Sequence, residues 1–162
     1  IQQQNGWCKE TMDLFDEIAH CQALSQMPSP HVQSVKLCHD IISTAKITNR
    51  YNSHMPATCI HCAHAEEVFD HLLRCNHAER KTWSHKLYKV LQETMDRQFT
   101  QPYLVDILQN DIDVWLCSTT IDASSYPQVY HKLIHNQMAM GWRQIFQGCM
   151  CREWVPPRPV SK

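Results

Sequence analysis

Glycine is scarce in this 162-residue chain, and its scarcity excludes the common nucleotide-binding loops. The three glycines, Gly6, Gly141 and Gly148, are isolated from one another. A phosphate-binding loop of the GxGxxG or GxxxxGK[ST] type needs several glycines within a few residues, because its backbone N–H groups approach the phosphate closely. The sequence contains neither motif.

An excess of one charge is also missing, since 15 Lys and Arg residues face 16 Asp and Glu residues, for a net charge of −1. Such a chain does not bind nucleic acid through bulk positive charge, although it can still carry a local basic face. No segment approaches the about 18 consecutive apolar residues that a transmembrane helix requires, so we expect no membrane span.

Strand signals are almost absent as well. No run alternates apolar and polar residues over the length of a strand, and no Asn-Gly or Asp-Gly pair joins two such runs. Apolar residues instead recur at helical spacing, which predicts an all-α fold of about six helices around one zinc-stapled turn. We expect these helices at about residues 11–27, 31–47, 66–75, 76–95, 102–116 and 127–147.

Helix-ending and helix-starting residues support these limits. Pro28 ends the first expected helix, a polar loop at 48–53 ends the second, and Asn76 caps the fourth. Pro102 suits a first helical position, and Gly148 suits a helix end. We expect residues 8–155 to form a single helical domain that contains a zinc-binding turn at 56–80, followed by an extended, mobile tail at 156–162. Three tryptophans lie on apolar stripes and are expected in the core: Trp83, Trp115 and Trp142.

Cysteine and histidine are abundant, with 9 and 11 residues. The cysteine count is odd and the chain is long for a disulfide scaffold, so we favour reduced thiols and metal binding over disulfides. This interpretation favours an intracellular, reducing compartment. Residue 1 is Ile, so we expect a processed or partial chain in which targeting signals cannot be read.

Four of these residues form the array C-x2-C-x8-H-x3-C, namely Cys59, Cys62, His71 and Cys75. A C-x2-C turn directs two thiolates to one point, and residues four apart on a helix share a face. The array therefore predicts one structural Zn²⁺ with four protein ligands and no open position for a catalytic water. Three other histidines could replace His71, which we prefer because it alone pairs with Cys75 across one helical turn: His61, His64 and His77.

Other interpretations of the cysteines stay open. Core cysteines and surface histidines could form such an array by chance in a chain this rich in both. The sequence Cys59-Ile60-His61-Cys62 also matches the C-x-x-C motif of thiol–disulfide oxidoreductases, although no strand leads into it. Cys149 and Cys151 have no second ligand pair nearby, so we expect ordinary thiols there and leave their role open.

Two longer runs include the cysteine array. The first is Pro56-Ala57-Thr58-Cys59-Ile60-His61-Cys62, followed by Glu66-Glu67, Asp70-His71, Cys75 and Arg80…Trp83. It resembles the zinc-binding segment downstream of the reverse transcriptase in non-LTR retrotransposons. The second is Gln137…Gly141-Trp142…Gly148…Trp154, and it resembles the C-terminal segment of retrotransposon-derived reading frames.

The resemblance covers about residues 35–155. It implies the same four zinc ligands, Cys59, Cys62, His71 and Cys75. The sequence departs from the family pattern at three positions: Ile60 stands in place of proline, and Cys149 and Cys151 stand in place of arginine and serine. The catalytic aspartates of the polymerase are absent from these 162 residues, and so is any endonuclease.

These observations predict a non-catalytic zinc-stapled module of retroelement origin that binds nucleic acid weakly or scaffolds a larger complex, such as the parent polyprotein. The expected nucleic-acid contacts are Arg80, Lys81, Lys86 and Lys89. These cations spread around their helix, so we expect weak and salt-sensitive binding. The alternative is a domesticated structural subunit of a multiprotein assembly with no nucleic-acid role, which the neutral charge favours. We expect no enzymatic turnover.

Overall fold

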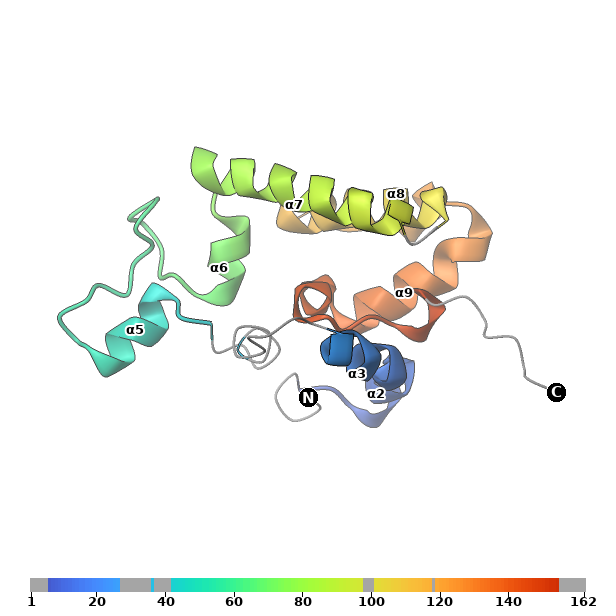
Figure 1. Cartoon of the computed structure of the whole chain (residues 1–162), viewed down its shortest axis with the longest axis horizontal. Coiled ribbons are helices and arrows are strands. Elements are labelled where there is room, and N and C mark those ends of the chain that lie inside the picture. Colours follow the sequence, from blue (N-terminus) through green and yellow to red (C-terminus); the bar gives the residue numbers. More distant parts are fainter. Residues whose placement is uncertain (1–5, 27–35, 37–41, 98–100, 118, 155–162) are drawn as a thin grey trace. The chain divides into compact units, whose positions relative to one another are not determined.

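The computed structural model describes residues 6–26, 36, 42–97, 101–117 and 119–154 (Figure 1). The chain divides into two compact units. The middle unit spans 41–121, and the terminal unit combines 1–40 with 122–162. The all-α prediction is confirmed, because the described residues form helices, with isolated β-bridges and no sheet. The single domain at 8–155 stays a prediction, and the tail at 156–162 lies outside the described residues.

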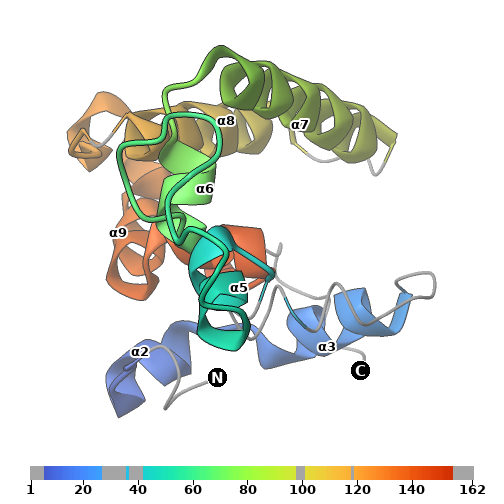
Figure 2. The same ribbon diagram turned by 90° about the vertical axis from the view of Figure 1, so that its left-hand side faces the viewer.

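The described residues of the middle unit form four α-helices: α5 (Ala45–Tyr51), α6 (Phe69–Arg74), α7 (Ala78–Arg97) and α8 (Pro102–Leu116). Helix α8 has proline in its first turn, as the sequence predicts, and buries four aliphatic side chains at helical spacing: Val105, Ile107, Leu108 and Ile112. Figures 1 and 2 show α7 beside α8, and α7 also contacts α6.

Three boundaries in this unit differ from the sequence prediction. Residues 48–51 belong to α5 and not to a loop, and this helix begins only at Ala45, where Thr44 caps it by accepting a hydrogen bond from the N–H of Ile47 at 3.3 Å. Helix α6 begins only at Phe69, since Glu66 and Glu67 pair with the preceding loop. The residue before α7 is His77 instead of Asn76, and its carbonyl accepts from Arg80 and Lys81.

In the described part of the terminal unit, the chain forms seven short elements. They are α2 (Lys9–Leu14), α3 (Glu17–Gln26), η1 (Ala123–Ser125), η2 (Gln128–Tyr130), α9 (His131–Met140), η3 (Trp142–Gln147) and η4 (Arg152–Trp154). Its buried residues include Trp7, Phe15, Leu133, Ile134, Trp142 and Trp154. The rings of Trp142 and Trp154 meet edge to face at 6.3 Å.

The continuous helices expected at 11–27 and 127–147 were wrong. Phe15 forms a β-bridge with Cys151, and the N–H of Asp16 donates to the carbonyl of Met150 at 3.2 Å, which separates α2 from α3. Gly141 separates α9 from η3 at a φ of 97°, a conformation that favours glycine. Gly148 ends η3 in the left-handed conformation, as the sequence predicts.

The tryptophan prediction holds in part. Trp142 is 3% exposed and lies in the core of the terminal unit. Trp115 is half-buried and has the guanidinium of Arg74 4.0 Å from its ring centroid. Trp83 is 43% exposed on α7, so its assignment to the core was wrong. Helical spacing places a residue on a stripe, but a neighbouring element must cover that stripe to bury it.

Candidate metal centre

A short hairpin presents the first two cysteines. The N–H of Cys59 donates to the carbonyl of Ala65 at 2.8 Å, and the N–H of Glu67 donates to that of Ala57 at 2.9 Å. Between them the chain turns at Ala63, which adopts a φ of 55° and donates its N–H to the carbonyl of Cys59 at 2.8 Å. This turn brings Cys59 and Cys62 to the same end of the loop.

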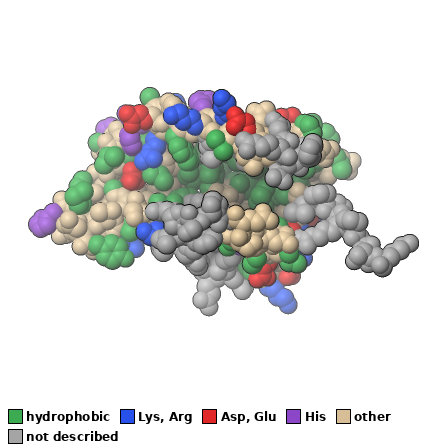
Figure 3. Space-filling model, viewed as in Figure 1, with side chains coloured by type: hydrophobic (Ala, Val, Ile, Leu, Met, Phe, Trp, Pro, Cys, Tyr) green, Lys and Arg blue, Asp and Glu red, His purple; other side chains and the backbone are tan. Residues whose placement is uncertain are grey.

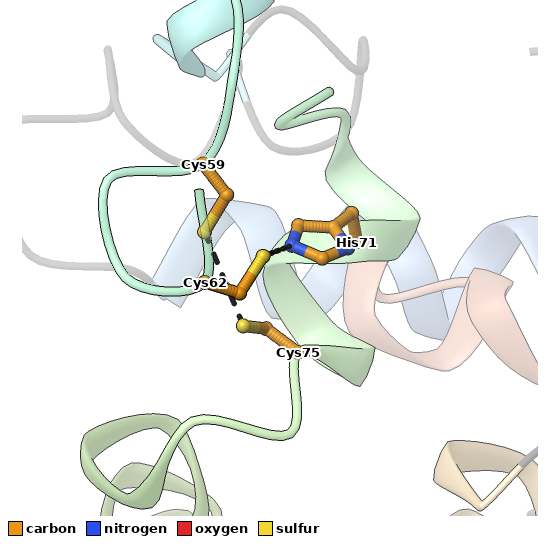
Figure 4. Close-up of side chains that lie close together, drawn as sticks. All are labelled: Cys59, Cys62, His71 and Cys75. Atoms are coloured by element: carbon orange, nitrogen blue, oxygen red, sulfur yellow. Dashed lines mark hydrogen bonds between the residues drawn. The ribbon is translucent and has the colours of Figure 1, made fainter. Parts of the chain in front are cut away.

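Helix α6 and the residue after it supply the other two side chains. His71 lies in α6, and Cys75 follows its last residue. The Sγ atoms of Cys59 and Cys75 are 3.9 Å apart, and Cys62 Sγ lies 3.3 Å from His71 Nε2 (Figure 4). All four ligand atoms lie within 4.8 Å of one another. The structure therefore brings together the four residues that the sequence names as metal ligands.

These separations fit a tetrahedral ion. Zinc bonds of about 2.3 Å to sulfur and about 2.0–2.1 Å to nitrogen place sulfurs about 3.8 Å apart and sulfur about 3.6 Å from nitrogen. The Cys59–Cys75 distance matches this geometry, and the Cys62–His71 distance is slightly shorter. The four side chains can hold a metal ion with only small movements.

The thiols of this cluster differ in acidity. The pKa of Cys62 is lowered to about 6, mainly because the backbone N–H groups of His64 and Ala65 donate to its sulfur. Burial raises the pKa of Cys75. Cysteine binds metal ions strongly only as the thiolate. The N–H groups around Cys62 favour its thiolate form, and a bound cation would stabilise the thiolate of Cys75.

The competing histidines lie elsewhere. His64 is exposed and belongs to no cluster of metal-ligating side chains among the described residues. His61 and His77 lie close to each other and to Glu79, in a second group separate from the four ligands. The structure thus groups His71, and none of the three alternatives, with the thiols.

A buried carboxylate connects the hairpin to its neighbours, and the sequence analysis gave it no such role. Glu67 accepts from the N–H of Ala45 at the start of α5 at 3.1 Å, and its other oxygen lies 3.4 Å from Arg80 Nη2 on α7. Its neighbour Glu66 forms an ion pair with Lys46 at 2.6 Å. The only feature of the sequence that could have indicated this role is the acidic pair Glu66-Glu67 after the C-x2-C turn.

The four cations expected to contact nucleic acid fall into two groups. Arg80 is half-buried and paired with Glu67, whereas Lys81, Lys86 and Lys89 are exposed on α7. In the space-filling view, basic, acidic and hydrophobic side chains are mixed along the edge formed by α7 (Figure 3). On this face, the described side chains of the helix form no uniform positive stripe.

The remaining cysteine pair is of a different kind. Cys149 and Cys151 are both buried in the terminal unit, and neither belongs to a metal-ligand cluster within the described part of the chain. The thiol of Cys151 donates to the carbonyl of Leu133 at 3.6 Å. No disulfide joins any of the cysteines that the structure describes.

No protein-family model, curated protein or solved structure matches this chain. Among the described residues, no helix combines the length and the apolar character needed to cross a bilayer.

Proposed function

We propose that this chain is a non-catalytic helical module stabilised by one structural Zn²⁺ bound to Cys59, Cys62, His71 and Cys75. The convergence of three sulfurs and one imidazole nitrogen within 4.8 Å carries this proposal. Three thiolates and an imidazole form a donor set that zinc prefers, and four protein ligands leave no position for a catalytic water. The role of the ion is therefore to hold the hairpin against α6.

The alternative chemistry of the C-x-x-C motif is less well supported. An oxidoreductase needs an accessible nucleophilic thiol, usually the first cysteine of the motif, at the start of a helix. Here Cys59 is fully buried, and the motif lies in a hairpin turn. A disulfide between Cys59 and Cys62 together with measurable reductase activity would overturn the structural role.

The origin of the module is proposed on the sequence resemblance alone. The run from Pro56 to Trp83 supports descent from the zinc-binding segment downstream of a retroelement reverse transcriptase. Such a module would act within a larger polypeptide or complex and contribute binding or scaffolding instead of chemistry.

The first candidate partner of this module is a nucleic acid, which it would bind weakly. Lys81, Lys86 and Lys89 are exposed and have no ion-pair partner among the described residues, and Trp83 on the same helix exposes 43% of its surface. Lysines with an exposed aromatic ring suit a single strand, whose bases stack on such rings. Neutralising three phosphates of a single strand gives a salt dependence with a slope of about −2 on logarithmic axes, and hence weak binding.

A protein partner is the second candidate. Val90 exposes 60% of its surface on the same helix as Trp83, and the two apolar side chains form a surface that a protein could cover. In this case the chain is a structural subunit without a nucleic-acid role.

Metal analysis of the purified chain tests the central proposal. We expect one zinc per chain, retained in the parent and lost in Cys59→Ser. A parent protein without tightly bound zinc under reducing conditions would overturn the proposal.

Titration with single- and double-stranded DNA and RNA at two salt concentrations separates the two partner classes. We expect Lys86→Ala to weaken nucleic-acid binding and Lys9→Ala, an exposed lysine of the terminal unit, to leave it unchanged. Equal binding by both variants would exclude Lys86 as a contact. Absence of binding at the lower salt concentration would favour the protein partner.

A further inference from the structure

A second group of metal-ligating side chains lies outside the Cys3His cluster. His61 comes from the hairpin, His77 precedes α7, and Glu79 lies in the first turn of that helix. One ligand atom from each of the three residues lies within 4.8 Å of the other two. None of the three is needed for the proposed structural zinc.

The three side chains converge from two segments of the chain. His61 Nδ1 lies 3.2 Å from Glu79 Oε2, and the rings of His61 and His77 are 5.1 Å apart, with an angle of 39° between their planes. The side chain of Glu79 is 72% exposed and that of His61 is 21% exposed, so an ion can reach the group from solvent.

Simpler roles explain only parts of this arrangement. A carboxylate in the first turn of a helix is favoured by the helix dipole, and His61 with Glu79 can form an ordinary ion pair. His77 has a simple local role as well, since its Nδ1 accepts a long hydrogen bond from the N–H of Glu79 at the start of α7, but that role does not require the ring of His61 to lie beside it. Two imidazoles and one carboxylate are a donor set that borderline divalent cations prefer.

We infer that His61, His77 and Glu79 form a second site, which binds a divalent transition metal ion such as Zn²⁺. This inference goes beyond the proposed function, because the second ion is bound by different residues. Three protein ligands leave at least one position for water or for a donor atom of a partner molecule. The ion links the tip of the hairpin to the start of α7.

Binding at this site is weaker than at the thiolates. The group offers no sulfur ligand, Glu79 is solvated, and the positive end of the α7 dipole opposes a cation. His77 Nδ1 also accepts a hydrogen bond from the N–H of Glu79, but at 3.4 Å this bond is long, so little is lost if the ring binds a metal instead.

The test uses the full chain loaded with one equivalent of Zn²⁺ and then titrated with Co²⁺. We expect one equivalent of Co²⁺ to bind and give visible absorption without the near-ultraviolet charge transfer that thiolate ligands produce. The Glu79→Gln variant should weaken Co²⁺ binding at least about tenfold, since even residues that only orient metal ligands contribute about 10- to 100-fold to affinity. His77→Ala should behave in the same way.

His64→Ala is the matched control, because His64 lies in the same hairpin but outside the group. Its Co²⁺ affinity should equal that of the parent. No Co²⁺ binding by the parent, or equal binding by the Glu79→Gln, His77→Ala and His64→Ala variants, would overturn the second site. Failure of the structural zinc is distinguishable, because the first equivalent of Zn²⁺ would then not be retained.

Discussion

Two cysteine-bearing segments of this chain use the same side chain in opposite ways. In the hairpin, Cys59 faces Cys75 at 3.9 Å, and backbone N–H groups surround Cys62. In the terminal unit, the thiol of Cys151 donates to a backbone carbonyl, as does that of Cys149. Both segments contain fully buried cysteines, so burial alone does not separate them.

The thiols of Cys62 and Cys151 differ most in acidity, while burial raises the pKa of the proposed ligand Cys75 as well. N–H donors lower the pKa of Cys62 to about 6, whereas burial, with a smaller effect from the carboxylate of Glu153, raises the pKa of Cys151 to about 12. Backbone N–H groups of Glu153 and Trp154 also lower the pKa of Cys151, but burial outweighs them, so this thiol stays protonated as a small apolar side chain. Metal binding by a cysteine therefore depends on which other ligands lie near its sulfur, as they do at Cys62, and not on cysteine content or burial alone.

Among the predicted changes, removal of one of the four proposed metal ligands should have the largest effect on metal content and stability. Cys75→Ser leaves three ligands, so we expect loss of zinc and of several kcal/mol of stability, because structural zinc in small domains contributes about 10–16 kcal/mol of binding free energy. Metal content and thermal unfolding measure the change. Cys117→Ser, at an exposed cysteine of the same unit, is the control and should retain the metal. A Cys75→Ser protein with full zinc content and an unchanged melting temperature would contradict the site.

In the terminal unit, replacing the buried amide of Gln137 should lower stability by the next largest amount. Gln137 Oε1 accepts from the N–H of Cys151 and from Trp154 Nε1, both at 3.0 Å. Gln137→Leu leaves both donors without this acceptor in the core, so we expect a loss of about 3 kcal/mol. Chemical denaturation measures it, with zinc content unchanged. His135→Leu, at an exposed position of α9, should cost far less, and similar losses in both variants would refute this role of Gln137.

The raised pKa of Cys151 predicts a pH dependence of stability. Below about pH 8.5 the thiol is protonated in both states and has no effect. Above that pH the unfolded chain loses this proton first, so the free energy of unfolding falls by about 1.4 kcal/mol per pH unit until the folded thiol titrates near 12.

Unfolding measured at pH 8 and pH 10 tests this dependence. Cys151→Ala should show a smaller fall than the parent over this range, because it removes the contribution of the thiol. Cys21→Ala, at an exposed cysteine of the same unit, should follow the parent. Parallel curves for the parent and Cys151→Ala would show that this thiol does not titrate abnormally.

The smallest expected effect concerns the hairpin turn. Ala63 adopts a φ of 55°, a conformation that costs a non-glycine residue about 1–2 kcal/mol. Ala63→Gly relieves this strain, so we expect a gain of up to about 1 kcal/mol after the greater flexibility of unfolded glycine is counted. Ala65→Gly has no such strain to relieve and should lose about 0.5–1 kcal/mol. Thermal unfolding of the zinc-loaded proteins checks the sign, and destabilisation by both changes would contradict it.

Sequence patterns predicted those features of the structure that depend only on residues close together in the chain. The spacing of Cys59, Cys62, His71 and Cys75 placed the four ligands in one array, and Pro102 marked the first residue of α8. A C-x2-C turn and a one-turn helical pair each need few residues, so their geometry can be deduced from the sequence. The fold class follows for the same reason, because helical periodicity is local.

The features that the sequence could not predict depend on contacts between residues far apart in the chain. Nothing near Phe15 indicates that it pairs with Cys151, yet this pairing divides the expected first helix. Glu67 and His61 likewise take their roles from Arg80 and Glu79, which lie 13 and 18 residues further along the chain. Trp83 lies on an apolar stripe, but its position leaves it exposed.

The division of the chain has a consequence for its synthesis. The middle unit is one continuous segment, 41–121, whereas the terminal unit needs residues from both sides of it. At about 5–20 residues per second, a ribosome takes on the order of ten seconds to add the intervening stretch. During that time Trp7 and Phe15 lack their partners Met140 and Cys151, which have not yet been synthesised. The hairpin with its thiols can meanwhile leave the ribosome, so all four proposed metal ligands are available before the terminal unit is complete.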